Sequence, residues 1–189
     1  MSQSAMQRIN VIGTTGSGKS TFSKTLAECL GYPYIQMDQL YWKRHWQEPE
    51  TEEFIQKLEA AITGVRWVLD GNYNRTNELK WQKVDTIIWL DYSYSRTLFQ
   101  LLKRTILRTI EGKELWPGTE NYETLRRSFL SRKSIIFWFF KFYKRNRERY
   151  SHLMESPEYK HIRRIRITSP RQAYQFLSDL KSNVSVNAS

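Results

Sequence analysis

Eight residues near the start of the chain, GTTGSGKS from Gly13 to Ser20, combine three glycines with a lysine and several hydroxyl groups. They match the pattern G-x-x-x-x-G-K-[ST] at every fixed position. Glycines allow positive φ, so that successive N–H groups turn inward and face phosphate oxygens. Lys19 would place a charge near the β- and γ-phosphates, and the Ser20 hydroxyl would be a Mg²⁺ ligand. The motif therefore predicts ATP binding by Gly13, Thr14, Thr15, Gly16, Ser17, Gly18, Lys19, Ser20 and Thr21.

The residues on either side of this motif are those of a strand and a helix. The apolar segment Arg8–Ile12 precedes it, and the helical pattern of Lys19–Leu30 follows it. The amino end of that helix would add its dipole to the phosphate site. A purely structural turn would require neither the lysine nor the hydroxyl, so this context favours phosphate binding.

Phosphoryl transfer from ATP also requires a carboxylate near the metal, at the end of a neighbouring buried strand. Asp70 ends the segment WVLD, and Asp91 follows the segment TIIWL. We favour Asp70 as the metal residue, because the turn after it would return Arg75 toward the same pocket. Asp91 lies in the N-cap region of a helix expected from Tyr94, which is a common structural role for aspartate.

Short apolar segments alternate with helical patterns along the chain, which is typical of βα units and a parallel sheet. The expected strands are Arg8–Ile12, Tyr34–Met37, Trp67–Leu69, Thr86–Leu90 and Ile162–Ile167. The expected helices are Lys19–Leu30, Thr51–Thr63, Tyr94–Ile110, Tyr122–Ser131, Ser134–Met154 and Arg171–Leu180.

These elements predict an α/β P-loop NTPase fold, with a five-stranded parallel sheet in the order 2-3-1-4-5 and helices on both faces. Residues 1–180 would form one domain, with an acceptor-binding insertion near 38–64 and a helical lid near 111–153. Residues 181–189 are polar and small, and a flexible tail is expected there.

The composition limits the classes of protein to consider. The chain has 189 residues and a single cysteine, which excludes an internal disulfide framework and suits a reducing compartment. No apolar stretch approaches the roughly 20 residues of a membrane span, so a cytoplasmic protein without a membrane partner is expected.

The formal charge is +11, and fourteen basic residues but only five acidic ones lie between Arg96 and Tyr150. Such a cluster suits a polyanionic partner, either a nucleotide or a nucleic acid, although a solvated basic helix surface would look the same.

With GTTGSGKST and WVLDGNYNR placed, the chain resembles the nucleoside monophosphate kinase group of P-loop proteins, which includes adenylate kinase and shikimate kinase. It is most similar to small proteins labelled DNA topology modulation proteins, which look like relatives of adenylate kinase. The blocks YIQMDQLYW, TIIWLDYS and ITSPRQAYQFL extend this resemblance from Arg8 to about Leu180. The resemblance implies a phosphotransferase that uses ATP and Mg²⁺.

The resemblance also implies roles for particular residues. Asp70 would hold Mg²⁺ through water, and Arg75 would face the transferred phosphoryl group, although one extra residue separates it from Asp70-Gly71 compared with the D-G-F-P-R of adenylate kinase. Arg104 and Arg108 would clamp the triphosphate from the lid side. Pro170 and Arg171, with Ser169, would lie beside the nucleotide base.

The acceptor would bind near the segment that follows the second strand. The resemblance to shikimate kinase implies that Asp38 orients or deprotonates an acceptor hydroxyl, while a helix cap or a partner for Arg44 is the structural alternative. Nearby Tyr41, Trp42 and Trp46 would either stack on a flat acceptor or form a partly buried wall.

A closing lid would bring arginines to the transferred phosphoryl group and exclude water. Arg126 and Arg127 precede an apolar helical stripe that begins at Ile135, and we predict a catalytic role for Arg127.

Two functions remain open from the sequence. One is a kinase acting on a nucleotide, nucleoside or hydroxyl metabolite; the other is a nucleic-acid-binding NTPase. A GTPase switch is disfavoured because the chain has no N-K-x-D segment.

Overall fold

Five parallel strands form one sheet in the order β2-β3-β1-β4-β5, as the sequence predicts. The computed structural model describes residues 6–124, Ser128 and residues 134–187. The strands lie within a residue or two of the expected bounds, at β1 (Arg8–Gly13), β2 (Tyr34–Gln36), β3 (Trp67–Asp70), β4 (Thr86–Leu90) and β5 (Arg163–Ile167).

The register of the strands brings the predicted chemical groups to one edge. Val11 pairs with Asp70, and Gln36 also lies opposite Asp70, while Gly13 lies opposite Leu90. Because all strands run in the same direction, the segments that follow them emerge together at the carboxyl edge of the sheet. The P-loop, Asp70 and the residues after β2 and β4 therefore surround one region.

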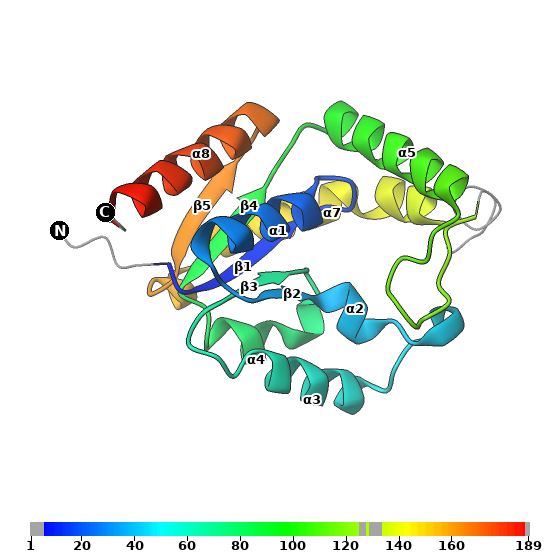
Figure 1. Cartoon of the computed structure of the whole chain (residues 1–189), viewed down its shortest axis with the longest axis horizontal. Helices are drawn as coiled ribbons and strands as arrows, with labels where there is room; N and C mark the ends of the chain where they lie inside the picture. Colours follow the sequence, from blue (N-terminus) through cyan, green and yellow to red (C-terminus); the bar gives the residue numbers. More distant parts are fainter. Residues whose placement is uncertain (1–5, 125–127, 129–133, 188–189) are drawn as a thin grey trace.

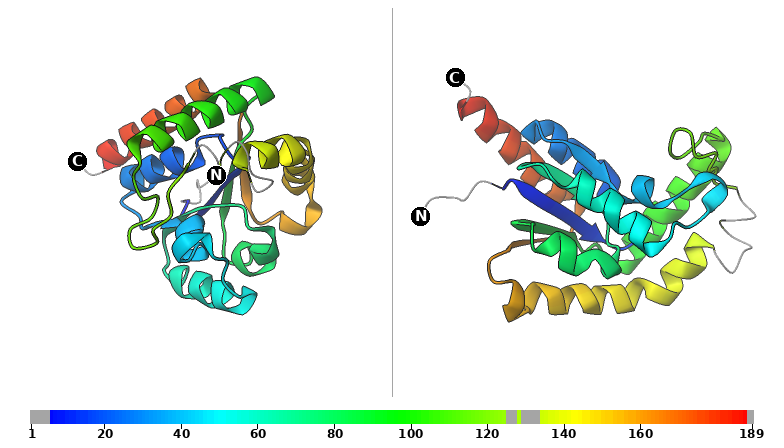
Figure 2. Two further views of the ribbon diagram at one scale, coloured as in Figure 1. Left: turned by 90° about the vertical axis from the view of Figure 1, so that its right-hand side faces the viewer. Right: turned by 90° about the horizontal axis from the view of Figure 1, so that it is seen from below.

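Helices cover both faces of the sheet, as Figures 1 and 2 show. One face packs against α1 and α8, and the other against α3, α4 and α7. Alternation within β4 serves both layers: Ile87 and Trp89 face one core, Ile88 and Leu90 the other. No helix in the described ranges is long and apolar enough to cross a membrane. The helices are α1 (Lys19–Leu30), α2 (Met37–Tyr41), α3 (Thr51–Ala61), α4 (Asn77–Trp81), α5 (Tyr94–Glu111), α7 (Ile135–Glu155) and α8 (Pro170–Asn187).

The structure differs from the sequence-based expectation at α2, at α4 and at the end of α8. The short helices α2 and α4 were not predicted, because five residues are too few for an apolar period to show. Helix α8 continues through Asn187, where a flexible tail is expected, since neither glycine nor proline follows Pro170 to end it. Most of the helix expected over Tyr122–Ser131 lies outside the described residues.

A buried amide joins the two central strands near the carboxyl edge. The Asn10 side chain, fully buried, donates to the carbonyls of Leu69 and Gly71, each at 3.1 Å. Its oxygen accepts from the indole N–H of Trp81 at 3.2 Å. All the hydrogen-bonding groups of this amide thus tie β1 to β3 and to α4, which fixes the turn that follows Asp70.

Lys80 on α4 is fully buried beneath the same turn. Its Nζ lies 3.4 Å from the carbonyl of Tyr73 and 5.7 Å from the ring centre of Trp81. No ion pair joins Lys80 to a carboxylate in the part of the chain that the structure describes. Burial lowers the pKa of Lys80 from its ordinary value of 10.5 to about 7.

This lysine predicts a pH dependence of stability. The unfolded chain binds more protons than the folded protein between about pH 7 and pH 10.5, so stability should rise with pH in that window. The slope would be at most about 1.4 kcal/mol per pH unit. Urea unfolding at pH 7.5 and pH 9 measures it, and Lys80→Met should remove the rise. An equal rise in both proteins would contradict the prediction.

Candidate active site

The P-loop motif forms the bend between β1 and α1 that its sequence predicts. Gly16 and Gly18 both have φ of +84°, and Gly18 immediately precedes the first helical residue, Lys19. The Lys19 Nζ donates to the Thr14 carbonyl at 3.3 Å, so the ammonium group lies over the loop. This is the backbone conformation in which N–H groups form a cradle for an anion.

Asn72, which the sequence analysis did not single out, fastens this loop to β3. Its Nδ2 donates to the Gly13 carbonyl at 2.7 Å, and its Oδ1 accepts from the Gly13 N–H at 3.2 Å. In the sequence, the only indication of this role is that Asn72 lies two residues after Asp70. That spacing points to the P-loop only once β1 and β3 are paired in the sheet. The amide thereby fixes the entrance of the P-loop relative to Asp70.

Lys19 and Asp70 form the electrostatic centre of the site. Burial lowers the pKa of Lys19, while the charges of Asp70 and Asp38 oppose that shift. Burial also raises the pKa of Asp70, against the effects of Lys19 and the Ser20 hydroxyl. The Tyr34 hydroxyl donates to Asp70 Oδ2 at 3.1 Å. Each charge is thus removed from water and is compensated mainly by the others.

The donor set at Asp70 and Ser20 suits magnesium. A carboxylate and a hydroxyl lie together at the end of the P-loop, as the causes of the Asp70 pKa shift show. Within the described ranges, no group of three or more His, Cys, Asp or Glu gathers as a metal cluster. Mg²⁺ commonly takes one or two protein ligands, and water and substrate phosphates complete its coordination.

Helix α5 supplies the predicted lid-side arginines. Burial and the neighbouring Arg108 lower the pKa of Arg104, whereas Glu123, Asp38 and Asp70 raise it. The Arg104 guanidinium is therefore close to the charges of the P-loop site. Arg108 forms an ion pair with Glu123 at 3.2 Å, which draws it toward the loop after α5.

Several polar atoms around α5 are buried without a hydrogen-bond partner in the described part of the chain. They come from the P-loop, from α5 and from the loop that follows it: Ser17 Oγ, Gln100 Oε1, Arg104 Nε, Thr105 Oγ1 and Glu123 Oε2. Unpaired polar atoms are costly in a folded interior, and a polar ligand is one common reason for them. Helix α5 also borders a cleft lined by Arg96, Phe99, Gln100, Lys103, Arg104, Leu107, Arg108 and Glu111.

Asp38 lies in the first turn of α2. The Tyr73 hydroxyl donates to Asp38 Oδ1 at 2.8 Å. Burial and the Asp38 charge raise the pKa of Tyr73, so the phenol keeps its proton and Asp38 accepts. No ion pair joins Asp38 to Arg44, whose guanidinium instead pairs with Glu120. The carboxylate is thus oriented by a phenol and lies close enough to Lys19 and Arg104 to shift their pKa values.

Arg75 lies among aromatic rings of α2 and α3. Its Nη2 donates to the Tyr41 hydroxyl at 2.8 Å, and its Nη1 donates to Thr51 at 3.3 Å. The guanidinium carbon lies 5.1 Å from the ring centre of Tyr41 and 5.9 Å from that of Phe54. These contacts hold the Arg75 side chain toward α2 and α3. This position is consistent with the one extra residue that separates Arg75 from Asp70-Gly71, compared with the D-G-F-P-R segment of adenylate kinase.

The remaining predicted site residues fall in different places. Thr21 is exposed on α1. Pro170 and Arg171 begin α8 directly after β5, and Arg171 is exposed. Arg127, together with Arg126, lies outside the described residues.

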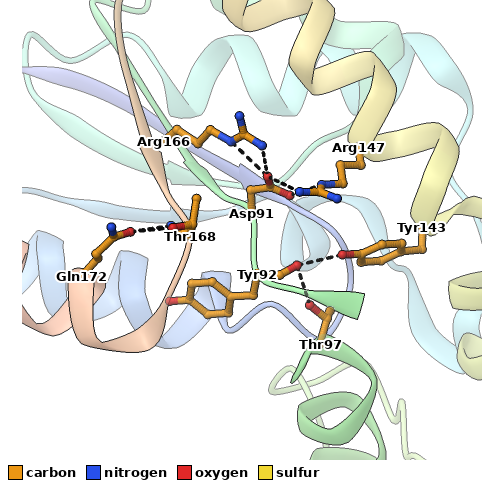
Figure 3. Close-up of polar contacts among 8 residues, drawn as sticks. All are labelled: Asp91, Tyr92, Thr97, Tyr143, Arg147, Arg166, Thr168 and Gln172. Atoms are coloured by element: carbon orange, nitrogen blue, oxygen red, sulfur yellow. Dashed lines mark hydrogen bonds and ion pairs between the residues drawn. The ribbon is translucent and has the colours of Figure 1, made fainter. Parts of the chain in front are cut away.

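Asp91 has a structural role, but a different one from the expected N-cap. Ser93 precedes α5 as its N-cap, and the Asp91 carboxylate binds two arginines (Figure 3). Arg147 of α7 donates from Nε at 2.9 Å, and Arg166 of β5 donates from Nε at 3.0 Å. In sequence these arginines are 56 and 75 residues away, so only the tertiary structure pairs them with Asp91.

The residue after Asp91 ties α5 to α7. The Tyr92 carbonyl accepts hydrogen bonds from the hydroxyls of Tyr143 at 2.8 Å and Thr97 at 3.4 Å (Figure 3). Asp91 and Tyr92 together therefore fix the direction in which α5 leaves the sheet. That direction determines where Arg104 lies.

Comparison with known proteins identifies kinases. Over 113 residues the chain is 28% identical to a shikimate kinase from Sulfurihydrogenibium sp. (strain YO3AOP1), an alignment that covers 51% of the chain and 67% of that protein. Over 71 residues it is 35% identical to a protein provisionally named as an adenylate kinase from Thermococcus onnurineus (strain NA1). That alignment covers 34% of the chain and only 39% of the relative. No family model matches the chain.

Solved structures extend the comparison over the whole chain. The shikimate kinase of Bacteroides thetaiotaomicron superposes with a TM-score of 0.55 at 15% identity, covering 96% of this chain and 99% of that one. The shikimate kinase of Aquifex aeolicus gives 0.51 at 17% identity, covering 96% and 98%. The fold is therefore an α/β P-loop NTPase fold, which these two shikimate kinases share. The comparisons give no support to the nucleic-acid-binding alternative or to the DNA topology modulation label.

The close contact between the P-loop and α5 predicts unequal effects of two glycine substitutions. A Cβ on Gly16 would lie 2.7 Å from Leu101 Cβ and 2.8 Å from the Thr97 carbonyl, whereas a Cβ on Gly18 would meet nothing within 4 Å. Both positions have the same positive φ, so Gly18→Ala is a matched control. We expect Gly18→Ala to cost about 1–2 kcal/mol through strain and Gly16→Ala about 1–3 kcal/mol more. Equal unfolding midpoints in urea would contradict this packing.

Proposed function

We propose that this protein is a kinase that transfers the γ-phosphoryl group of ATP to a hydroxyl group of a small acceptor molecule. The observation that carries the proposal is the convergence of Lys19, Asp70, Asp38 and Arg104 at the carboxyl edge of the sheet, where the charges of Asp38 and Asp70 both act on the pKa values of Lys19 and Arg104. The P-loop fold and the kinase names of the relatives support it.

The P-loop and its neighbours would bind the triphosphate. The inward N–H groups of Gly13–Ser20 would hold the β-phosphate, and the Lys19 ammonium would neutralise charge between the β- and γ-phosphates. Arg104 would approach the γ-phosphoryl group from α5, where charge spreads over the equatorial oxygens during transfer. An anion at this position would also compensate the cost of burying both cations.

Asp70 and Ser20 would hold the magnesium ion that accompanies ATP. The bound ion would neutralise the charge that develops on the β- and γ-phosphate oxygens. Tyr34 and Ser20 both interact with Asp70, so its carboxylate is already oriented toward the P-loop. Burial keeps this carboxylate away from competing water.

Asp38 would act as the general base, and Tyr73 would orient it. The Asp38 carboxylate would accept the proton of the acceptor hydroxyl while that oxygen bonds to the γ-phosphorus. The bond between the γ-phosphorus and the β,γ-bridging oxygen breaks, and ADP leaves with the electron pair. A carboxylate at this place suits a hydroxyl acceptor, because a phosphate acceptor carries no proton that must be removed at neutral pH.

Acceptor-dependent ADP production tests this function. A panel of hydroxylated metabolites, nucleosides and nucleoside monophosphates is added to protein with MgATP, and ADP release is measured. We expect one hydroxylated compound to raise the rate, and Asp38→Asn to lower that rate by about 10²–10⁴-fold. Equal activity of Asp38→Asn, or a rate increase with nucleoside monophosphates alone, would refute the role of Asp38.

Arg104 should contribute to turnover much more than to stability. Arg104→Ala removes a cation from the phosphoryl site, and we expect kcat to fall by about 10²–10³-fold. Its unfolding midpoint should not fall, because the guanidinium is desolvated and its Nε is unpaired. Lys24→Ala, which removes an exposed lysine of α1, is the control and should retain full turnover. Equal turnover in both variants would exclude a catalytic role for Arg104.

A further inference from the structure

Two segments far apart in sequence are joined beyond the carboxyl edge of the sheet. Residues 43–47 follow α2 on the acceptor side, and residues 116–121 belong to the loop after α5; we call the pair the clasp. Figure 1 shows the loop after α5 descending to meet the segment that follows α2. The His45 N–H donates to the Thr119 carbonyl at 3.0 Å, so the contact includes the backbone of both segments.

Asn121 is the centre of the clasp. It is fully buried, its Oδ1 accepts from the Trp46 N–H, and its Nδ2 donates to the Lys43 carbonyl at 2.9 Å. Its own carbonyl accepts from the Leu115 N–H at 2.9 Å. The side-chain amide of Asn121 thus satisfies two backbone groups of the facing segment, 43–47, as strands satisfy one another in a sheet.

The backbone is strained at this junction. In the described ranges, the non-glycine residues with positive φ are His45 at 53°, Trp46 at 61° and Glu120 at 53°. All three belong to the clasp. Non-glycine residues rarely adopt this conformation, which is energetically unfavourable for side chains of this size. The surrounding contacts compensate for this cost, among them the ion pair of Glu120 with Arg44 and the contact of the Glu120 carboxylate with His45 Nε2 at 3.3 Å.

Aromatic rings connect the clasp to the candidate base. Tyr73, whose hydroxyl holds Asp38, lies 4.7 Å from Tyr41 between ring centres, and Tyr41 lies 5.0 Å from Trp42. The row continues from Trp42 to Trp46 at 5.4 Å and from Trp46 to Trp116 at 5.8 Å. Because packed rings cannot move independently, the conformation of the clasp bears on the position of Asp38.

We propose that the clasp closes the acceptor end of the site, limits acceptors to small molecules and keeps water from the γ-phosphoryl group. This proposal rests on the function proposed above. In the closed form seen here, the strained segments bridge the acceptor side and the α5 side. Asn121 and Trp46 are then specificity-determining residues, since they hold the bridge together without contacting the phosphates.

Opening the clasp has a chemical consequence that needs no identified acceptor. Water would then reach the γ-phosphorus, its oxygen would form the new bond, and its proton would pass to Asp38 or to solvent. The bond to the β,γ-bridging oxygen breaks and ADP leaves, so the products are ADP and inorganic phosphate. Exclusion of water is a recognised function of active-site closure.

Asn121→Ala tests the clasp through two independent measurements on the full chain. Hydrogen exchange without nucleotide reports the closed form, and we expect the amides of His45 and Trp46 to be protected in the parent protein and to exchange at least tenfold faster in the variant. Release of ADP from MgATP without acceptor reports water entry, and we expect a rise of about fivefold or more. Lys113→Ala, an exposed change in the same loop, is the control and should alter neither measurement.

Arg44→Ala provides a second, surface variant that does not depend on the folding of Asn121→Ala. It removes the ion pair with Glu120, and we expect smaller changes in the same directions. Faster exchange without increased ADP release would overturn the proposal, as would unprotected His45 and Trp46 amides in the parent protein. If no acceptor stimulates ADP release while both variants behave as expected, the clasp stands and the proposed kinase activity fails.

Discussion

The mutual compensation of buried charges at the carboxyl edge of the sheet is the interaction on which the rest of the structure depends. Lys19, Asp70, Asp38 and Arg104 are removed from water to different degrees, and each shifts the pKa of another. Burying such groups is costly unless they are paired and hydrogen bonded. The site meets this cost partly through Tyr34 and Tyr73, whose hydroxyls donate to the two aspartates. A polyanionic nucleotide would complete the compensation.

The scaffold around the site is held by polar groups as well as by apolar packing. Asn10 ties β1 to β3, Asn72 ties the P-loop to the turn after β3, and Asp91 ties β4 to α7 and β5. Each of these side chains satisfies backbone groups or arginines that would otherwise be left unpaired. Their hydrogen bonds are directional, so they fix the angles at which the segments leave the sheet. Positioning of this kind is what phosphoryl transfer requires, because catalysis depends mainly on geometry and charge.

The side of the site that we propose for the acceptor has a different character. Its packed interior is a cluster of aromatic rings, and Arg75 lies over the ring faces of Tyr41 and Phe54. Such a surface excludes water while it leaves a small number of polar groups to orient a substrate. In the clasp, these ring contacts continue through Trp46 to Trp116 in the loop after α5.

The nucleotide half of the site could be predicted from the sequence because its groups are close together in the chain. The P-loop from Gly13 to Ser20 needs only a strand before it and a helix after it, and the five strands follow from apolar segments and helical patterns. The turn that follows Asp70 favours it over Asp91 as the metal residue, and the structure places Asp70 beside Lys19 and Ser20. Tertiary structure decided the interactions between distant residues. The two arginines that bind Asp91, the aromatic surroundings of Arg75 and the amide of Asn121 that joins two loops are examples. A local pattern determines which backbone conformation forms, but buried polar groups find their partners only when the chain has folded and water no longer competes for them.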